Sequence, residues 1–407
     1  MAGSVKRAIG GLVLTGLAAG FAVPAGAQTA GASEQQNWQA TISNETRFMN
    51  WASTYGHPAP VFGTSKSKGW QVYSSSGFQL VGRLNDDTKL SLLLRSGAIS
   101  AHQSSAGLSN SYAGFTDTTV GATLTYYGID GIQPFVAIQV NLPTGSGSSS
   151  GYASKMDSDI SKIPNYGEGY NVGATAGLTI PISRALVAAL SAGFTHRGPY
   201  MSDGALGSLS AQSLNPGEVF TLTSSLTYKQ GPLNAQLSAV YTSETKARMA
   251  GLDYFRSGDK VQLTASAGYR WSDAWSSKVS ASWSHLQRNQ VFVTPPPALN
   301  LEPFNSNGDV LSLDVSTSYR IGALSLTPSV GLLHRTKNSY DPVNLAFVPA
   351  KTTTSVGLGA AYAVTDRASL TASVGHTWAL ENPRLTPTTP RLHTRVLMTS
   401  IGGSIKF

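Results

Sequence analysis

The chain has 407 residues, of which only 12% are charged, and its formal net charge is +8. It contains no cysteine, which excludes disulfides and thiol-based metal or redox sites. The basic residues are scattered rather than grouped in runs, which argues against a nucleic-acid-binding protein. With 42 glycines and a mean hydropathy of -0.06, the composition is unusual for a soluble enzyme and is typical of strands with one face in lipid and one in water.

The N-terminus has the three parts of a secretory signal peptide. Lys6 and Arg7 precede an apolar run that ends near Val23, and small residues follow up to Ala27. The run is too short and too rich in Gly and Ala for the alternative, a transmembrane anchor. The sequence therefore predicts a signal peptide over 1–27, a short periplasmic segment over 28–37 and a barrel domain over 38–407.

Apolar and polar residues alternate with a period of two along the whole remaining chain. In the segment 259–271, Val261, Leu263 and Tyr269 share one face, whereas Lys260 and Gln262 lie on the other. Helical spacing would spread such residues over all sides, so the pattern predicts strands of about 9–11 residues or more, long enough to cross a bilayer at a tilt. The predicted strands are 38–50, 70–84, 89–99, 117–127, 132–142, 170–180, 185–197, 218–229, 233–244, 259–271, 275–287, 309–320, 323–335, 352–364, 368–378 and 394–407.

The connections between these segments alternate between short and long. Tight turns such as Asn85 to Thr88 and Ile321-Gly322 carry the expected turn residues, whereas the gaps after odd-numbered strands are much longer. A soluble β-sandwich has no reason to sort its loops in this way. The fold class that we predict is therefore all-β: a transmembrane, antiparallel, up-and-down barrel of about 16 strands, with short periplasmic turns and long extracellular loops. Because Pro134 and Pro328 fall inside predicted strands, a barrel of 14 strands stays open as the alternative.

Aromatic residues gather near the two ends of the apolar faces, as interfacial girdles do. Ordinary core aromatics, the alternative, would be scattered along the strands. The expected girdle residues are Tyr126, Tyr228, Tyr269, Tyr319, Tyr362 and Phe407 beside the short turns, and Phe48, Trp70, Phe194, Tyr241 and Trp283 beside the long loops. The C-terminal Phe407 also ends an apolar face that resembles the signal by which the barrel-assembly machinery recognises its clients.

No enzyme motif is present, and we predict no catalytic residue, metal or cofactor. His196, His285, His334 and His376 share a position near the long-loop end of ascending strands. They are either contacts for lipopolysaccharide phosphates or amphipathic rings that the interface tolerates.

The polar faces of the strands predict the lining of the pore. The candidates are Glu45, Arg47, Arg83, Arg95, Arg197, Glu244, Lys260, Arg270, Lys278, Asp314, Arg320, Arg335 and Lys406. Bases outnumber acids among them, so we expect a mild anion preference that falls as salt rises. Alternatively, these charges pair with one another or neutralise lipid phosphates at the rims. Glu45 and Asp314 lie mid-strand, where either could face a basic partner across the pore.

A sixteen-stranded barrel encloses an aqueous channel, which a long loop could narrow. The longest gap, 143–169, is the first candidate for this role, and the gap 288–308 is a rival. A flexible surface loop is the alternative. The candidate constriction residues are Lys155, Asp157, Asp159, Lys162 and Glu168.

Sixteen strands with a long loop after the fifth are similar to the general bacterial porins, in which that loop forms the constriction. The segment from Gly121 to Gly145, through Gln133-Pro134-Phe135 and Leu142-Pro143-Thr144-Gly145, resembles the putative outer-membrane transporters of the meta-pathway phenol-degradation family. These resemblances imply a channel for passive diffusion of small solutes, among them small aromatic or apolar compounds. The expected location is the cell outer membrane, with lipid and lipopolysaccharide as partners, and the sequence leaves open whether a second copy of the chain is a further partner. A structural or adhesive barrel whose extracellular loops bind a partner is the alternative function.

Overall fold

The structure is a computed structural model that describes residues 38–53, 66–105, 108–145, 167–202, 212–293, 298–344, 346–383 and 391–407. The regular elements within these ranges are all β-strands. None of the described segments forms a helix long and apolar enough to cross a membrane. The predicted signal peptide and the segment 28–37 lie outside the described residues.

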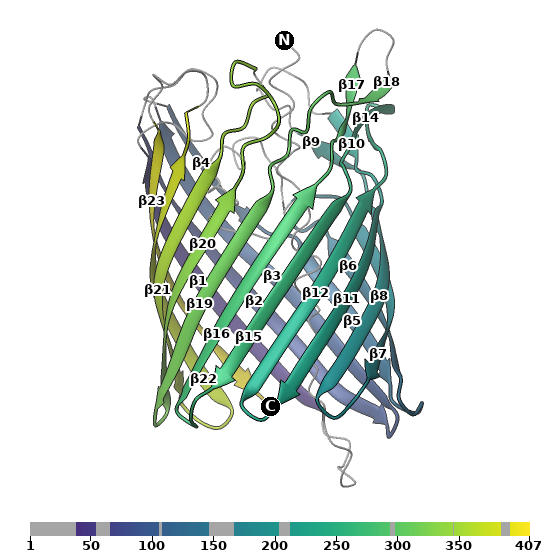
Figure 1. The fold of residues 1–407 in the computed structure, drawn as a ribbon, viewed down its shortest axis with the longest axis vertical. Coiled ribbons are helices and arrows are strands. Elements are labelled where there is room, and N and C mark those ends of the chain that lie inside the picture. The colour runs from purple at the N-terminus through teal and green to yellow at the C-terminus, as the bar shows by residue number, and fades with distance from the viewer. Residues whose placement is uncertain are drawn as a thin grey trace.

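Sixteen strands form one closed antiparallel barrel (Figure 1). Each pairs with its neighbour in the chain, and β1 also pairs with β23, from Thr41 opposite Lys406 to Ser53 opposite Thr394, which closes the wall. This ring confirms the predicted fold class and excludes the alternative of 14 strands. The wall strands are β1 (Gln39–Ser53), β2 (Ser67–Asn85), β3 (Thr88–Ser105), β5 (Thr118–Tyr126), β6 (Gln133–Leu142), β7 (Asn171–Pro181), β8 (Leu186–Arg197), β11 (Val219–Gln230), β12 (Leu233–Glu244), β15 (Lys260–Arg270), β16 (Trp275–Leu286), β19 (Val310–Ile321), β20 (Leu324–Arg335), β21 (Lys351–Ala363), β22 (Ala368–Glu381) and β23 (Leu392–Lys406).

The two prolines lie inside strands and each leaves one ladder incomplete. Pro134 pairs with Leu178 of β7, whereas the ladder between β5 and β6 begins only at Phe135. Pro328 pairs with Leu358 of β21, whereas the ladder between β19 and β20 has a gap at this height. Proline has no N–H to donate, so one neighbouring ladder loses a bond while the other continues.

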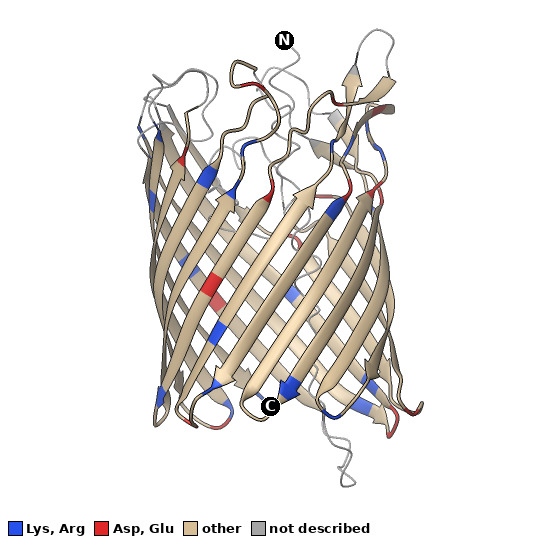
Figure 2. Ribbon diagram, in the orientation of Figure 1, with Lys and Arg blue, Asp and Glu red and all other residues tan. Residues whose placement is uncertain are grey.

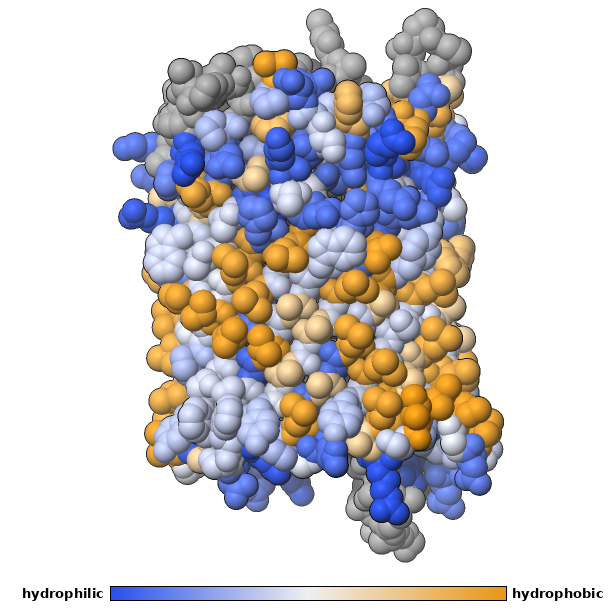
Figure 3. All heavy atoms as spheres, in the orientation of Figure 1, coloured by the Kyte–Doolittle hydropathy of each residue, from blue (hydrophilic) through white to orange (hydrophobic). Residues whose placement is uncertain are grey.

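The outer face of the wall is apolar. Leu237, Leu311 and Leu370 are each more than half exposed, and no described segment packs against this face as a second sheet would. Figure 3 shows apolar residues gathered in a band across the face of the barrel in view, with hydrophilic residues above and below it. A closed wall satisfies its own backbone hydrogen bonds and can present such a band to lipid, so this is a transmembrane barrel.

Several long loops are themselves built from strands, which the sequence did not predict. β3 runs on beyond the wall, and β4 (Leu108–Phe115) pairs with that extension. Three successive loops join in a separate six-stranded sheet above the barrel (Figure 1). Its strands are β9 (Tyr200–Ser202), β10 (Gln212–Asn215), β13 (Ala247–Met249), β14 (Leu252–Arg256), β17 (Gln290–Val293) and β18 (Ala298–Leu301).

Candidate functional site: the barrel lumen

The pairing register decides which side chains face the lumen. Residues directly opposite each other in antiparallel strands lie on the same face, so orientation can be followed from strand to strand. Ile42 and Phe48 are exposed on the apolar outer face of β1, which turns Glu45 and Arg47 inward. The register places every predicted pore-lining residue on the inner face, including Lys406. Four further charged residues share that face: Lys89, Lys229, Lys351 and Glu381.

Most of the remaining inner face consists of Gly, Ser and Thr. Hydroxyl groups pair across neighbouring strands, as between Ser282 and Ser312 at 2.7 Å and between Ser373 and Ser400 at 2.8 Å. Short side chains take little room, so they leave the lumen wide. A barrel of sixteen strands has space for an aqueous channel, and this lining is hydrophilic.

The mid-wall charges form two groups on different parts of the wall. On one side, the Arg47 guanidinium lies 2.8 Å from the Glu45 carboxylate, and Arg95 of β3 interacts electrostatically with the same carboxylate. The ionic partner of Glu45 is thus two residues away on its own strand, not across the pore. On the other side, Asp314 and Lys278 lie diagonally on neighbouring strands, and neither has an ion pair within the described part of the chain.

The short-turn end of the lumen is basic. Six inward residues lie within two positions of a strand terminus at this end: Arg83, Lys89, Lys229, Arg270, Arg320 and Lys406. No inward carboxylate belongs to the described strand ends that surround them. Figure 2 shows the coloured charges concentrated near the strand ends and in the loops, with few in the middle of the wall. This basic ring is the most uniform electrostatic feature of the lumen.

The long-loop end carries charges that are buried. Arg197 and Glu244 form an ion pair at 2.7 Å, with side chains only 9% and 13% exposed. The Arg197 side chain also donates to the Gly217 carbonyl. Lys351 lies opposite both Arg335 and Glu381 in the register, and Lys351 and Glu381 are buried. Two predicted pore residues, Arg197 and Glu244, are therefore part of a buried structural pair.

An apolar cluster lies on the inner face near the long loops, where sequence reasoning expected polar residues. Met49, Trp51 and Val396 pack together, and Tyr73 and Ile99 form a second cluster with Tyr112 of β4. The Trp51 ring covers Gly69 so closely that a Cβ there would clash with it. The sequence signal was the apolar pair Met49 and Trp51 on the face of β1 that also carries Glu45 and Arg47.

Asp117, between β4 and β5, holds both ends of the longest loop. Its carboxylate accepts hydrogen bonds from the Gly145 amide at 2.9 Å and from the Gly167 and Glu168 amides at 3.1 and 3.2 Å. Asn141 adds a fourth bond. Sequence reasoning missed this residue because the loop ends lie 28 and 50 positions away.

The predicted constriction residues lie partly at this loop base. Glu168 is buried there and accepts a hydrogen bond from Asn171. Burial, together with the nearby Glu168 carboxylate, raises the pKa of Tyr200 in the adjacent loop to about 12. Lys155, Asp157, Asp159 and Lys162 lie outside the described residues.

The rival loop over 288–308 belongs to the outer sheet. It forms the hairpin of β17 and β18, which Figure 1 shows above the wall. Glu302 anchors it by accepting hydrogen bonds from the Asn289 amide at 2.8 Å and the Ser306 amide at 3.1 Å. No group of three His, Asp or Glu residues that could hold a metal ion occurs in the described ranges.

No protein-family model matches this sequence, and no curated protein matches it. Three solved structures illustrate what the fold is similar to. A deletion mutant of the monoaromatic hydrocarbon channel TodX is 12% identical, with a TM-score of 0.44, covering 92% of this chain and 91% of that one. OccK11 of Pseudomonas aeruginosa is 13% identical, with a TM-score of 0.44 and coverages of 91% and 96%. A loop-deletion mutant of OmpT, an outer membrane protein of Vibrio cholerae, is 10% identical, with a TM-score of 0.40 and coverages of 90% and 99%.

Proposed function

We propose that this protein is a channel of a Gram-negative outer membrane, through which small solutes diffuse passively with a mild preference for anions. The observation that carries the proposal is the inner face of the closed wall, where bases outnumber acids and hydroxyl and glycine residues make up most of the rest. A positive potential raises the local concentration of anions in water. Mobile ions screen that potential, so the preference falls as salt rises.

The basic ring at the short-turn end sets the sign of this preference. Unlike Arg47 and Arg197, its members have no ion pair within the described residues, so no carboxylate neutralises their charge at close range. The apolar cluster around Met49 and Trp51 is buried and offers little free surface to an aromatic or apolar solute. We therefore favour small polar anions over apolar compounds as the transported class. We assign no catalytic residue, metal or cofactor to the barrel.

Assembly in the membrane is part of the proposal. The Phe407 amide donates to the Ala40 carbonyl at 2.9 Å, and the Phe407 ring is exposed on the outer face. This exposed terminal segment is available to the barrel-assembly machinery, after a signal peptide over 1–27 has directed export. Lipid and lipopolysaccharide surround the apolar band, and a second copy of the chain is a further partner for it.

Planar-bilayer recording of the purified full-length mature protein tests the proposal. We expect stepwise conductance and, under a salt gradient, a reversal potential of the sign that anion movement gives. The potential shrinks when both solutions are concentrated at an unchanged ratio, up to about 1 M salt, where the Debye length is about 3 Å. A folded protein that never conducts, or one that selects cations at low salt, would disprove the proposal.

The outer six-stranded sheet favours a second candidate function, an adhesive barrel. Within the described part of the chain, its end strands β9 and β18 each pair on one side only, so the other edge presents backbone groups that a partner strand could use. The same recording separates the two functions, because a sealed adhesive barrel does not conduct.

A further inference from the structure

Among the described residues, the outer face of the wall strands carries only two charged side chains, and they flank the same residue of β1. Lys68 of β2 and Arg395 of β23 are both opposite Ala52 of β1 in the register, and Ala52 lies on the same outer face as the exposed Phe48. All other charged residues of the wall strands face inward. Charge on a lipid-facing wall is unfavourable unless it meets a counter-charge, so this pair calls for a ligand.

The two side chains flank a small residue at a distance suited to one anionic group. Neighbouring strands lie about 4.8 Å apart, so Lys68 and Arg395 are separated by about 10 Å across the wall. Ala52 does not fill the space between them. Both side chains are exposed, and neither has an ion-pair partner among the residues that the structure describes.

Aromatic rings lie beside the two cations on the outer face, at the same level and one step closer to the membrane. Trp378 is opposite Arg395, and Trp70, two residues below Lys68, is stacked on His102 with ring centroids 6.3 Å apart. His376 packs against Trp378 at 4.3 Å. Tryptophan is typical of the lipid headgroup level, which places the two cations at the outer edge of the membrane. Apolar Val72 and Ile401 continue the same face toward the middle of the wall.

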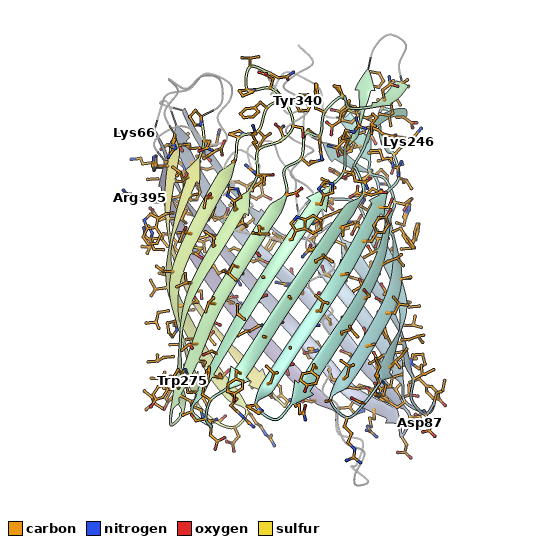
Figure 4. All side chains as sticks on the ribbon, in the orientation of Figure 1. Lys66, Asp87, Lys246, Trp275, Tyr340 and Arg395 are labelled. Carbon is orange, nitrogen blue, oxygen red and sulfur yellow. The ribbon has the colours of Figure 1, made fainter. Side chains whose placement is uncertain are left out.

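On the other side of the barrel, the outward-facing basic groups at this level are paired with carboxylates. There, His196 pairs with Glu218 at 2.8 Å and His285 pairs with Asp309 at 2.7 Å, so the outward rings have carboxylate partners. No described residue on the outer face of β22, β23, β1, β2 or β3 is a carboxylate, because Glu45 and Glu381 face inward. Lys66, at the position before β2, adds another base to this side. In Figure 4 Lys66 and Arg395 project from one side of the barrel and Lys246 lies on the other.

We propose that Lys68 and Arg395 bind the phosphate of an anionic glycolipid of the outer leaflet, with its acyl chains along Val72 and Ile401. The inference rests on the proposed location in the outer membrane, where the long loops face outward. A guanidinium and an ammonium group are suited to phosphate, and the apolar wall below them is suited to acyl chains. A free phosphate ion would gain nothing from the apolar wall, so the occupant is a lipid.

Native mass spectrometry of the detergent-purified full-length mature protein tests this site, with diphosphorylated lipid A as the probe. We expect wild type to retain the lipid and Lys68→Ser/Arg395→Ser to bind it about 30-fold more weakly, at about 1 kcal/mol for each base near the surface. The matched control, Lys246→Ser/Arg248→Ser, removes two bases that are paired with Asp253 and should bind as wild type does. Lys68→Arg/Arg395→Lys, which keeps both charges, should retain binding and shows that folding is intact.

Three results would overturn the site: equal binding by wild type and Lys68→Ser/Arg395→Ser, equal binding of dephosphorylated lipid A, or full competition by millimolar inorganic phosphate. Conductance measurements on the same variants distinguish failure of the lipid site from failure of the channel proposal. We expect the outward substitutions to leave conductance unchanged. Lipid binding by a barrel that does not conduct would support the site and contradict only the channel.

Discussion

The Arg197 guanidinium lies 2.7 Å from the Glu244 carboxylate, on the inner face where β8 and β12 reach the long loops. β11 runs between these two strands, and both side chains are almost fully buried. Two charged residues that the sequence pattern assigns to the pore lining thus form a buried ion pair that links β8 to β12 at the long-loop end of the barrel.

Removing one partner of this pair should destabilise the barrel strongly. Arg197→Met leaves the Glu244 carboxylate buried without its counter-charge, and breaking a buried pair in this way costs about 3–5 kcal/mol. The double variant Arg197→Met/Glu244→Leu leaves no buried charge and should recover most of the loss. The midpoint of heat-induced unfolding, followed by the electrophoretic shift of the barrel, measures both. Equal midpoints for the single variant and wild type would contradict the structural role.

Glu45→Gln should raise anion selectivity without loss of stability. Arg47 and Glu45 are 49% and 37% exposed, so their ion pair adds little to folding. The substitution leaves Arg47 and Arg95 without a nearby acid on that part of the wall. One charge acting at about 10 Å through water amounts to about 0.4 kcal/mol, with opposite sign for an anion and for a cation, which corresponds to about a fourfold rise in the anion-to-cation permeability ratio. The reversal potential in a salt gradient measures it, and a fall in the ratio would contradict this assignment.

Neutralising part of the basic ring should have the opposite effect. Arg270→Gln/Arg320→Gln removes two inward bases at the short-turn end, and we expect the permeability ratio to fall about fourfold or more by the same Coulomb estimate. Arg184→Gln, in an exposed turn at the same end, is the control and should leave selectivity unchanged. If the control moves the ratio as much as the ring variant does, the inner ring does not set selectivity.

Asp117→Ala should loosen the base of the longest loop. The carboxylate accepts bonds from the amides of Gly145, Gly167 and Glu168, which the substitution leaves without that acceptor. An unsatisfied buried donor costs about 1–3 kcal/mol, so the unfolding midpoint should drop. Asp117→Asn keeps one acceptor oxygen, so its unfolding midpoint should lie between those of wild type and Asp117→Ala. Open-channel current noise in single-channel records should rise in the same order, whereas unchanged noise and midpoint would show that the clamp is dispensable.

The Asp253 carboxyl in the outer sheet should stay ionised to a lower pH than an ordinary aspartate does. Hydrogen bonds from Lys246 and then Arg248 hold the pKa of Asp253 below its ordinary value. Because the folded pKa is lowered, this pairing contributes fully above the ordinary carboxyl pKa and is lost as pH falls through the lowered one. Carboxyl ¹³C NMR measures the titration. Lys246→Gln/Arg248→Gln should return the pKa to its ordinary range, and an unshifted pKa in wild type would contradict the contact.

The wall of the barrel could be predicted from the sequence alone. Alternation with a period of two is a local property, so strands such as 259–271 and 309–320 were placed within a residue of their limits at β15 and β19. The same alternation assigned Lys260 and Asp314 to the inner face and Tyr269 to the outer one. The unequal loop lengths fixed which end of the wall carries the short turns.

The tertiary structure alone decided which residues meet. The partner of Arg197 is 47 positions away, and the amides that Asp117 binds come from both ends of a loop. The strands of the outer sheet are only three to five residues long, too short for a periodic signal, and they form because neighbouring loops pair with one another. Lys68 and Arg395 lie at opposite ends of the chain and become neighbours only when β23 closes on β1. Side-chain direction follows from local alternation, whereas contact depends on the register of the closed wall, which no local pattern determines.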